Sequence, residues 1–273
     1  MTDLSPGTYF TILGCGSSGG VPRLGGNWGD CNPSNPKNRR TRCSALVTRV
    51  GDDGGVTRVL IDTSPDMRSQ LLDAGVGALD AVVYTHSHAD HMHGIDDLRM
   101  IVYNMRKRVP VWADSPTQTA LMSRFGYAFV QPEGSSYPPI LDLHAIRDDE
   151  DVVIDGDGGP IRMTPFEVRH GNMDSLGFRI GDLAYLPDVS EIPEDVTHVL
   201  QGLNIFVIDA LRRSPHPTHF NLDDALEWIK RSGTKQGVLT NMHIDLDYDT
   251  VLAETPDNVT VAFDGMVLPI RHS

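Results

Sequence analysis

The sequence predicts a mixed α/β protein, and three observations support this class. Mostly apolar runs of strand length alternate with helical patterns along the chain. The 273 residues, 40% hydrophobic and 22% charged, are enough for a sizeable core in one large domain or two small ones. Several of the apolar runs end in His or Asp, so polar side chains are expected at strand ends.

Strands are expected where short apolar runs are bounded by turn-forming residues. In chain order they lie near 8–14, 44–50, 57–62, 79–85, 109–113, 140–146, 152–154, 161–169, 176–180, 183–186, 204–209, 236–240 and 259–269. Helices are expected near 65–74, 95–107, 116–125 and 221–232. Pro65 suits a first helical turn and Gly75 the position after a helix, while Asn221 and Gly233 are typical of an N-cap and a C-terminal stop.

Two loops, 25–42 and 131–139, are rich in Gly, Pro, Ser or Asn. We expect one or both to shape a substrate pocket, because loops on a rigid scaffold often carry function.

The segment 84–94 carries the strongest functional signal, because four potential metal ligands fall within six residues directly after an apolar run: His86, His88, Asp90 and His91. Imidazole and carboxylate together suit Zn²⁺, Mn²⁺ or Fe²⁺, and ligands this close fit two ions better than one. A solvated His-rich turn is the alternative. Three more donors that follow strand-like runs argue against it: His170, Asp188 and His243.

This order of donors, His-x-His-x-Asp-His and then a lone His, Asp and His, resembles the metallo-β-lactamase superfamily. The likeness runs from the Gly-rich opening 12–22 to His243. The opening is similar to one branch, which holds the tRNA 3′-processing endonucleases and the phosphoribosyl cyclic phosphodiesterases of phosphonate breakdown. The resemblance implies a single hydrolase domain over 1–273 with a four-layer αββα sandwich, in which outer helices cover two facing sheets.

Carried over by motif, the resemblance implies two divalent ions, zinc or manganese. One ion would be held by His86, His88 and His170. The other would be held by Asp90, His91 and His243, and Asp188 would bridge the two. Asp62 would orient a ligand without binding the ion itself, although taken alone it could equally cap a helix or occupy a turn.

The resemblance also names His219 and Asp90 as catalytic residues. His219 begins the segment 219–225, which matches the family motif near the scissile phosphate, where a His binds phosphate or protonates the leaving oxygen. His216 is a rival for this role, and both could simply belong to a loop before a helix. Asp209 ends another strand-like run and either lines the site or caps a turn.

Four residues are candidates for binding the substrate phosphate: Arg40, Arg42, His216 and Ser18. Guanidinium groups bind phosphate with two parallel hydrogen bonds, which makes the basic cluster at 39–42 of interest. A solvated loop or a subunit contact explains this cluster equally well. Some relatives carry a Cys-x-Cys-x-x-Cys zinc site here, but this chain reads Cys31-Asn32-Pro33-Ser34-Asn35, so no structural zinc is expected.

Charge and composition restrict the partners. The net charge of −14 repels polyanions, which argues against a large nucleic acid but not against a small phosphorylated sugar or nucleotide. No apolar run approaches the ~20 residues of a membrane span, the first residues do not resemble a signal peptide, and three cysteines do not form a disulfide framework. We therefore expect a cytoplasmic protein without membrane partners, and the resemblance suggests a homodimer.

The expected reaction is the hydrolysis of a small cyclic or nucleotide-like phosphodiester, for which divalent ions activate water and stabilise charge. The resemblance points to 5-phosphoribosyl 1,2-cyclic phosphate, opened to ribose 1,5-bisphosphate. A tRNA 3′-processing endonuclease is the first alternative, against which the net charge argues. A non-catalytic nucleotide sensor is the second, although binding alone needs no complete ligand set. A thioesterase or lactonase stays open because fold does not fix function.

Overall fold

Two seven-stranded sheets form the frame of the molecule. The computed structural model describes residues 4–147 and 150–271. The strands of the first sheet are β1 (Gly7–Gly14), β2 (Ser44–Val50), β3 (Val56–Ile61), β4 (Ala81–Val83), β5 (Val109–Ala113), β6 (Leu141–Ala145) and β14 (Met266–Ile270). Those of the second are β7 (Val152–Ile154), β8 (Ile161–His170), β9 (Met173–Ile180), β10 (Leu183–Leu186), β11 (Ile205–Asp209), β12 (Gln236–Thr240) and β13 (Val259–Val261).

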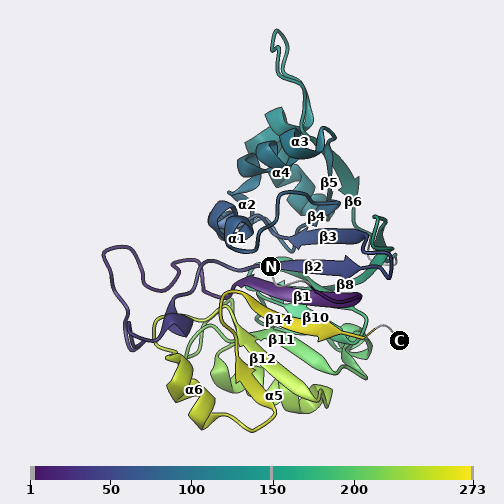
Figure 1. The fold of residues 1–273 in the computed structure, drawn as a ribbon. Coiled ribbons are helices and arrows are strands. Elements are labelled where there is room, and N and C mark those ends of the chain that lie inside the picture. Colours follow the sequence, from purple (N-terminus) through teal and green to yellow (C-terminus); the bar gives the residue numbers. More distant parts are fainter. Residues whose placement is uncertain (1–3, 148–149, 272–273) are drawn as a thin grey trace.

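Helices gather at the two ends of the view in Figure 1, with α1 to α4 at the top and α5 and α6 at the bottom. Their bounds are α1 (Met67–Asp73), α2 (Ala89–Met92), α3 (Leu98–Met105), α4 (Ser115–Phe129), α5 (Leu222–Ser232) and α6 (Tyr248–Glu254). Short 3₁₀ turns are η1 (Pro36–Asn38), η2 (Ile95–Asp97) and η3 (Glu194–Leu200). Within the described ranges, no helix has both the length and the apolar character needed to cross a bilayer.

The four layers follow from the alternation of side chains along each strand. On β3, Val59 and Ile61 face inward and pack in the large core that includes the second sheet. Leu60, between them, faces outward and packs with residues of α1, α3 and α4. On the other side of the molecule, buried residues of α5 and α6 cover the second sheet. The predicted αββα sandwich is therefore confirmed.

The predicted strand 259–269 is wrong in one respect, because the chain turns at 262–265 between β13 and β14. The carboxylate of Asp264 accepts hydrogen bonds from the backbone N–H groups of Cys15 (3.1 Å) and Thr41 (2.7 Å), which holds the turn against the first sheet. The helices α2 and α6 and the turn η3 were not predicted; α2, with four residues, is too short to show a helical period.

Topology brings the strand ends to one edge. Strands β3 to β6 run parallel to one another, as do β10 to β13. The loop after β4, the last residue of β8 and the loops after β10 and β12 carry the predicted metal ligands. Open α/β sheets bind ligands at the carboxyl ends of parallel strands, and the two facing sheets bring this edge to one site.

Candidate metal centre

Close backbone packing holds the loop that carries the histidine motif. After β4 the chain passes through His86 and His88 and then forms α2. Gly94 follows and donates its N–H to the carbonyl of Thr63 (2.9 Å). A Cβ at Gly94 would lie 2.1 Å from the carbonyl oxygen of Ser64, so the close approach requires glycine.

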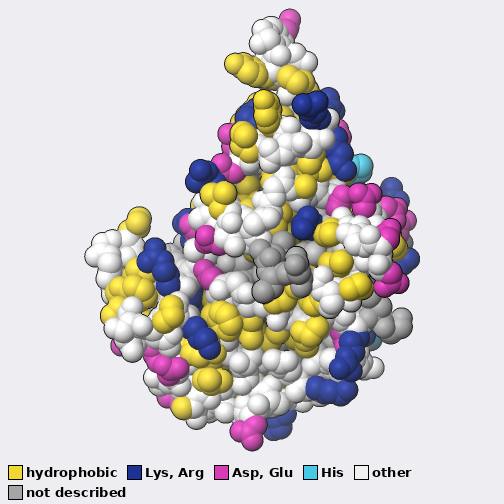
Figure 2. Space-filling model, viewed as in Figure 1, with side chains coloured by type: hydrophobic (Ala, Val, Ile, Leu, Met, Phe, Trp, Pro, Cys, Tyr) yellow, Lys and Arg dark blue, Asp and Glu magenta, His cyan; other side chains and the backbone are white. Residues whose placement is uncertain are grey.

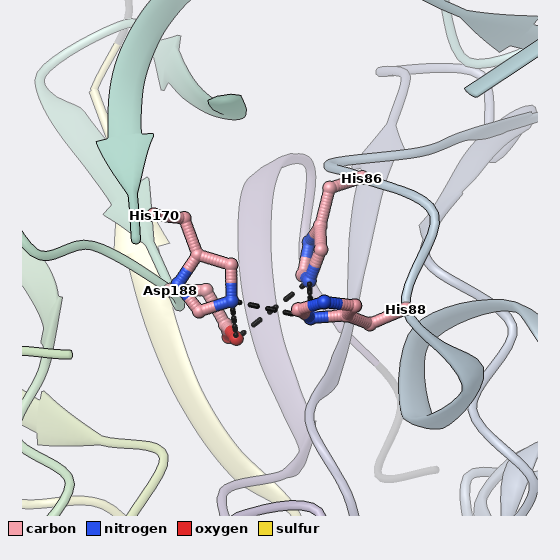
Figure 3. Close-up of side chains that lie close together, drawn as sticks. All are labelled: His86, His88, His170 and Asp188. Atoms are coloured by element: carbon pink, nitrogen blue, oxygen red, sulfur yellow. Dashed lines mark hydrogen bonds and ion pairs between the residues drawn. The ribbon is translucent and has the colours of Figure 1, made fainter. Parts of the chain in front are cut away.

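Four donors converge below this loop: His86 and His88 after β4, His170 at the end of β8, and Asp188 after β10 (Figure 3). Their ligand atoms all lie within 4.8 Å of one another. His88 Nδ1 is 3.0 Å from His86 Nε2 and 3.2 Å from His170 Nε2, and Asp188 Oδ2 is 3.7 and 3.5 Å from the same two nitrogens. Ligands of tetrahedral zinc lie about 3.4 Å apart when its bonds are about 2.1 Å long. The spacing therefore fits one ion.

The charge states of this group also suit a metal. Burial lowers the pKa values of His86, His88 and His170, and the nearby Asp188 carboxylate offsets this only in part. The imidazoles are therefore neutral at pH 7, which is the form that binds metals. Burial opposes the charge of Asp188, but the imidazoles of His91 and His86 outweigh it and hold its pKa well below the usual range.

A second set of donors faces the other oxygen of Asp188. His91 Nε2 is 3.2 Å from Asp188 Oδ1 and 3.7 Å from Asp90 Oδ2. This nitrogen is buried, yet it has no partner with hydrogen-bond geometry in the described part of the chain. A buried ring nitrogen that is aimed at carboxylates without a hydrogen bond fits metal coordination. Asp188 thus lies between two groups of donors.

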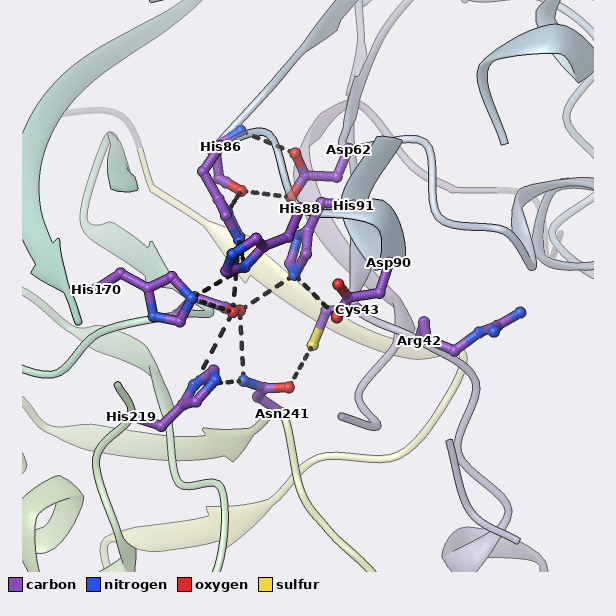
Figure 4. A network of polar contacts seen from close by, with 12 residues as sticks. Arg42, Cys43, Asp62, His86, His88, Asp90, His91, His170, His219 and Asn241 are labelled. Atoms are coloured by element: carbon purple, nitrogen blue, oxygen red, sulfur yellow. Dashed lines mark hydrogen bonds and ion pairs between the residues drawn. The ribbon is translucent and has the colours of Figure 1, made fainter. Parts of the chain in front are cut away.

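Asp62 fixes the orientation of His91 (Figure 4). Its buried carboxylate accepts hydrogen bonds from the Nδ1 of His91 (2.7 Å) and from the backbone N–H and hydroxyl of Thr85 (2.8 Å each). Asp62 has a φ of 62°, a left-handed conformation that aspartate adopts more readily than most residues. With its Nδ1 proton held by Asp62, His91 directs its Nε2 toward Asp188 and Asp90. Burial opposes a charge on this ring, but Asp188, Asp62 and Asp90 outweigh it and raise the pKa of His91 well above its usual range, so an ion bound at Nε2 would displace a proton.

His243 stands apart from the compact group. Its Nε2 contacts the guanidinium of Arg23 and its Nδ1 is 3.2 Å from Asp245 Oδ1. Burial and the Arg23 cation lower the pKa of His243. His243 nevertheless lines the same cavity as Asp90, so its role as a ligand of the second ion stays a prediction.

A polar network joins Asp188 to His219 through Asn241, and Figure 4 shows Asn241 beside His219. Asp209 Oδ2 accepts a hydrogen bond from His219 Nδ1 at 2.8 Å. The amide of Asn241, directly after β12, donates to Asp209 Oδ1 (3.1 Å) and to Asp188 Oδ1 (3.3 Å). Burial opposes the charge of His219, but Asp209 and Asp188 outweigh it and raise the pKa of His219 to about 9. No pattern in the sequence marked Asn241, apart from its position two residues before His243.

A cavity of about 480 Å³ opens onto this centre. Ser18 and His216 line it together with His88, Asp90, Asp188, His219 and His243. The ring of His216 lies 5.2 Å from that of His219. Burial and the neighbouring His219 lower the pKa of His216, so the two rings differ in charge at neutral pH.

The structure places Arg40 and Arg42 away from the metal centre, so their expected phosphate contacts stay a prediction. Arg40 is only 1% exposed, and its guanidinium donates to the carbonyls of Leu246 (2.7 Å) and His243 (3.3 Å). Arg42 binds both carboxylate oxygens of Asp66. Both guanidinium groups are therefore committed within the protein, and neither lines the cavity at the metal centre.

With this geometry established, comparison with known proteins identifies the class. The beta-lactamase superfamily domain matches residues 57–244, and the chain belongs to this superfamily. A solved structure described as a new diphosphatase from the PhnP family is 35% identical, with a TM-score of 0.85 and coverage of 97% of this chain and 98% of that one. The match agrees with the branch that the Gly-rich opening predicts.

Two curated relatives extend the comparison. An octanoyltransferase of Porphyromonas gingivalis (strain ATCC BAA-308 / W83) is 32% identical over 260 residues, which are 93% of this chain but 50% of that protein. The chain thus spans half the length of that relative. A ribonuclease Z of Mycobacterium sp. (strain KMS) is 26% identical over 234 residues, covering 76% of this chain and 79% of that protein. The superfamily match and the His/Asp cluster agree on a site that suits a metal ion.

Proposed function

We propose that this chain is a phosphodiesterase that hydrolyses a small phosphorylated substrate at a two-metal centre. The observation that carries the proposal is the compact group of His86, His88, His170 and Asp188 beside the His219–Asp209 pair. Asp90, His91 and His243 would complete the second metal position. Divalent ions bound there acidify water and neutralise the charge of the phosphodiester.

His219 is the proposed general acid. Asp209 holds its Nδ1 proton, which leaves Nε2 to face the cavity and to protonate the departing oxygen. The raised pKa of His219 supports this role, since a general acid must carry its proton at the working pH. His216 lacks a carboxylate partner of this kind among the described residues, and its lowered pKa suits a neutral ring that contacts substrate.

The proposed substrate is 5-phosphoribosyl 1,2-cyclic phosphate, which would be opened to ribose 1,5-bisphosphate. The solved PhnP-family relative, whose description names a diphosphatase, supports a small phosphorylated substrate. A tRNA 3′-end nuclease is the second candidate, because a ribonuclease Z is among the relatives. The net charge of −14 favours the small substrate.

The test is hydrolysis of bis(p-nitrophenyl) phosphate by chelator-treated protein and by protein reloaded with Zn²⁺ or Mn²⁺. We expect turnover only after reloading. His88→Ala should abolish it together with metal binding, whereas His219→Ala should keep the metal and lose about 10²- to 10⁴-fold in kcat. No turnover with two ions bound per chain would contradict the proposal, and cleavage of precursor tRNA would then favour the nuclease.

A further inference from the structure

A second cavity lies far from the metal centre, at the end of the sandwich where β8 begins. It measures about 650 Å³, and Arg162 at the start of β8 lines it. His170, the metal ligand, ends the same strand eight residues later, which corresponds to about 27 Å of extended chain. Among the described residues, none lines both this cavity and the one at the metal centre. A ligand here would therefore be separate from the substrate.

Strand register determines which side chains reach this cavity. On β8, Ile161 and Met163 are buried in the core between the sheets, so Arg162 and Thr164 point to the opposite face of their sheet. Arg179 of β9 is paired with Thr164 and lies on the same face. The helices α5 and α6 pack against β11 to β13, at the other end of the strand order. Polar side chains, rather than these helices, therefore occupy this part of the sheet.

Three guanidinium groups meet in the cavity, those of Arg49, Arg162 and Arg179. Arg162 forms an ion pair with Asp151 (2.8 Å). In the described part of the chain, Arg49 and Arg179 donate hydrogen bonds only to backbone carbonyls, which hold a guanidinium without neutralising its charge. Asp155 is the remaining carboxylate of the lining. Positive charge therefore exceeds negative charge here, in a chain whose net charge is −14.

The same carbonyls hold both unpaired arginines in place. Arg49 Nη1 donates to the carbonyl of Pro160 (2.7 Å), and its guanidinium lies over Gly159, where a Cβ would come within 3.2 Å of Arg49 Nε. Arg179 donates through Nε and Nη1 to three carbonyls, those of Gly181 (3.0 Å), Val199 (2.7 Å) and Gln201 (2.9 Å). The Nη2 groups of both arginines take no part in these hydrogen bonds. Donors that are fixed before a ligand arrives lose less conformational entropy on binding.

We propose that Arg49, Arg162 and Arg179 form a second ligand site, which binds the phosphate group of a small molecule other than the substrate. Guanidinium groups match the oxygens of phosphate with parallel, charge-assisted hydrogen bonds. The cavity has the volume of a small-molecule pocket, and Val153 and Pro160 in its lining offer apolar contact to the rest of the ligand. The site does not depend on the proposed phosphodiesterase function, because none of its residues belongs to the metal centre.

Calorimetry with inorganic phosphate tests the second site. Zn²⁺-loaded protein and chelator-treated protein should both bind phosphate at this site, because it needs no metal. Arg49→Gln should weaken this metal-independent binding about 10-fold or more, since it removes a charge-assisted contact. Arg68→Gln is the matched control and should bind as the wild type does. Arg68 is an exposed arginine of α1, on the other sheet, and it also forms no ion pair in the described ranges.

Arginine labelling with phenylglyoxal, read by mass spectrometry, locates the site in the Zn²⁺-loaded wild type and needs no variant. At ten times its Kd, phosphate should slow the labelling of Arg49 and Arg162 about 10-fold by mass action and leave that of Arg68 unchanged. Labelling of Arg49 at the same rate with and without phosphate would overturn the second site, as would wild-type phosphate binding by Arg49→Gln. A protein that shows the protection but hydrolyses no phosphodiester would contradict the phosphodiesterase function alone.

Discussion

Replacement of Asp62 by alanine is the sharpest test of how this centre is built. Asp62 is fully buried and contacts no substrate cavity, so its effect must pass through the groups that it holds. The variant removes the only carboxylate that orients His91 through its Nδ1 in the described part of the chain. It also leaves the backbone N–H of Thr85 without its acceptor, whereas the Thr85 hydroxyl keeps its contact with His86 Nδ1 (3.0 Å).

The magnitude follows from these contacts. An unsatisfied buried donor costs about 1–3 kcal/mol. Two such donors, the N–H of Thr85 and the ring nitrogen of His91, give a loss of about 2–6 kcal/mol in the free energy of unfolding. Removing a carboxylate that orients a metal-bound histidine lowers metal affinity about 10- to 100-fold. The variant should therefore be less stable and should bind metal more weakly at the proposed second position, which includes His91.

Two measurements separate these effects. Urea unfolding of the metal-free protein gives the stability, and titration against a Zn²⁺ chelator gives the affinity. Tyr84→Phe is the matched control, because the hydroxyl of Tyr84 bonds to Thr63 (2.7 Å) in the same buried region without touching His91. We expect Tyr84→Phe to lower the free energy of unfolding by about 1 kcal/mol and to leave the affinity for Zn²⁺ unchanged. An Asp62→Ala protein that binds two ions with wild-type affinity would refute the assigned role.

Three further predictions concern stability of the metal-free protein, measured by urea unfolding. Gly94→Ala should lower the free energy of unfolding by about 1–3 kcal/mol or more, because the added Cβ would clash with the backbone. Gly126→Ala is the control: its added Cβ in α4 would have no heavy atom within 4 Å, so the free energy of unfolding should stay unchanged or rise. Arg40→Met should lower the free energy of unfolding by about 2–5 kcal/mol, because it leaves buried carbonyls unpaired. The control Arg39→Met, at an exposed side chain, should change it by less than about 0.5 kcal/mol. Equal effects of the two variants would contradict the structural role of Arg40. Burial opposes the charge of Asp247, but hydrogen bonds from the N–H groups of Asn32 and Thr250 outweigh it and lower its pKa to about 2. Because the folded-state pKa lies below the ordinary value, Asp247 stabilises the fold above about pH 4 and loses this effect as the pH falls towards 2. Asp247→Asn should therefore be less stable than the wild type at pH 7, with a difference that narrows at pH 3.

Sequence patterns predicted most elements of this fold, because an apolar run of strand length indicates both where a strand lies and that it is buried. The strand predicted over 259–269 overlooked a local turn signal, the Asp264-Gly265 pair, whose glycine has a φ of 86°. Hydrogen bonds to Asp264 from residues more than 200 positions away hold this turn between β13 and β14. Helices as short as α2 show no period, and their existence depends on packing.

The same distinction between local pattern and tertiary contact applies to the residues of the site. Histidines and aspartates at strand ends were visible from residue type and spacing, because metal binding demands particular donors. The burial of Arg40 could not be predicted, because residue type does not say whether a guanidinium faces a cavity or donates to carbonyls of its own protein. Asn241 was invisible for the opposite reason, since an amide has no characteristic chemistry until its position between Asp188 and Asp209 is known.

The division of the donors between the two sheets explains why their relative positions could not be read from local patterns. His86, His88, Asp90 and His91 follow a strand of the first sheet, whereas His170, Asp188 and His243 follow strands of the second. The sandwich core, in which Phe10 of β1 meets Tyr185 of β10 with ring centroids 5.1 Å apart, sets the spacing between these two groups. Asp188 follows a strand of the second sheet but lies close to His86 and His91, which follow a strand of the first. These contacts depend most directly on the distance between the sheets. The geometry of the centre is therefore a property of sheet packing, and the loops supply only its chemistry.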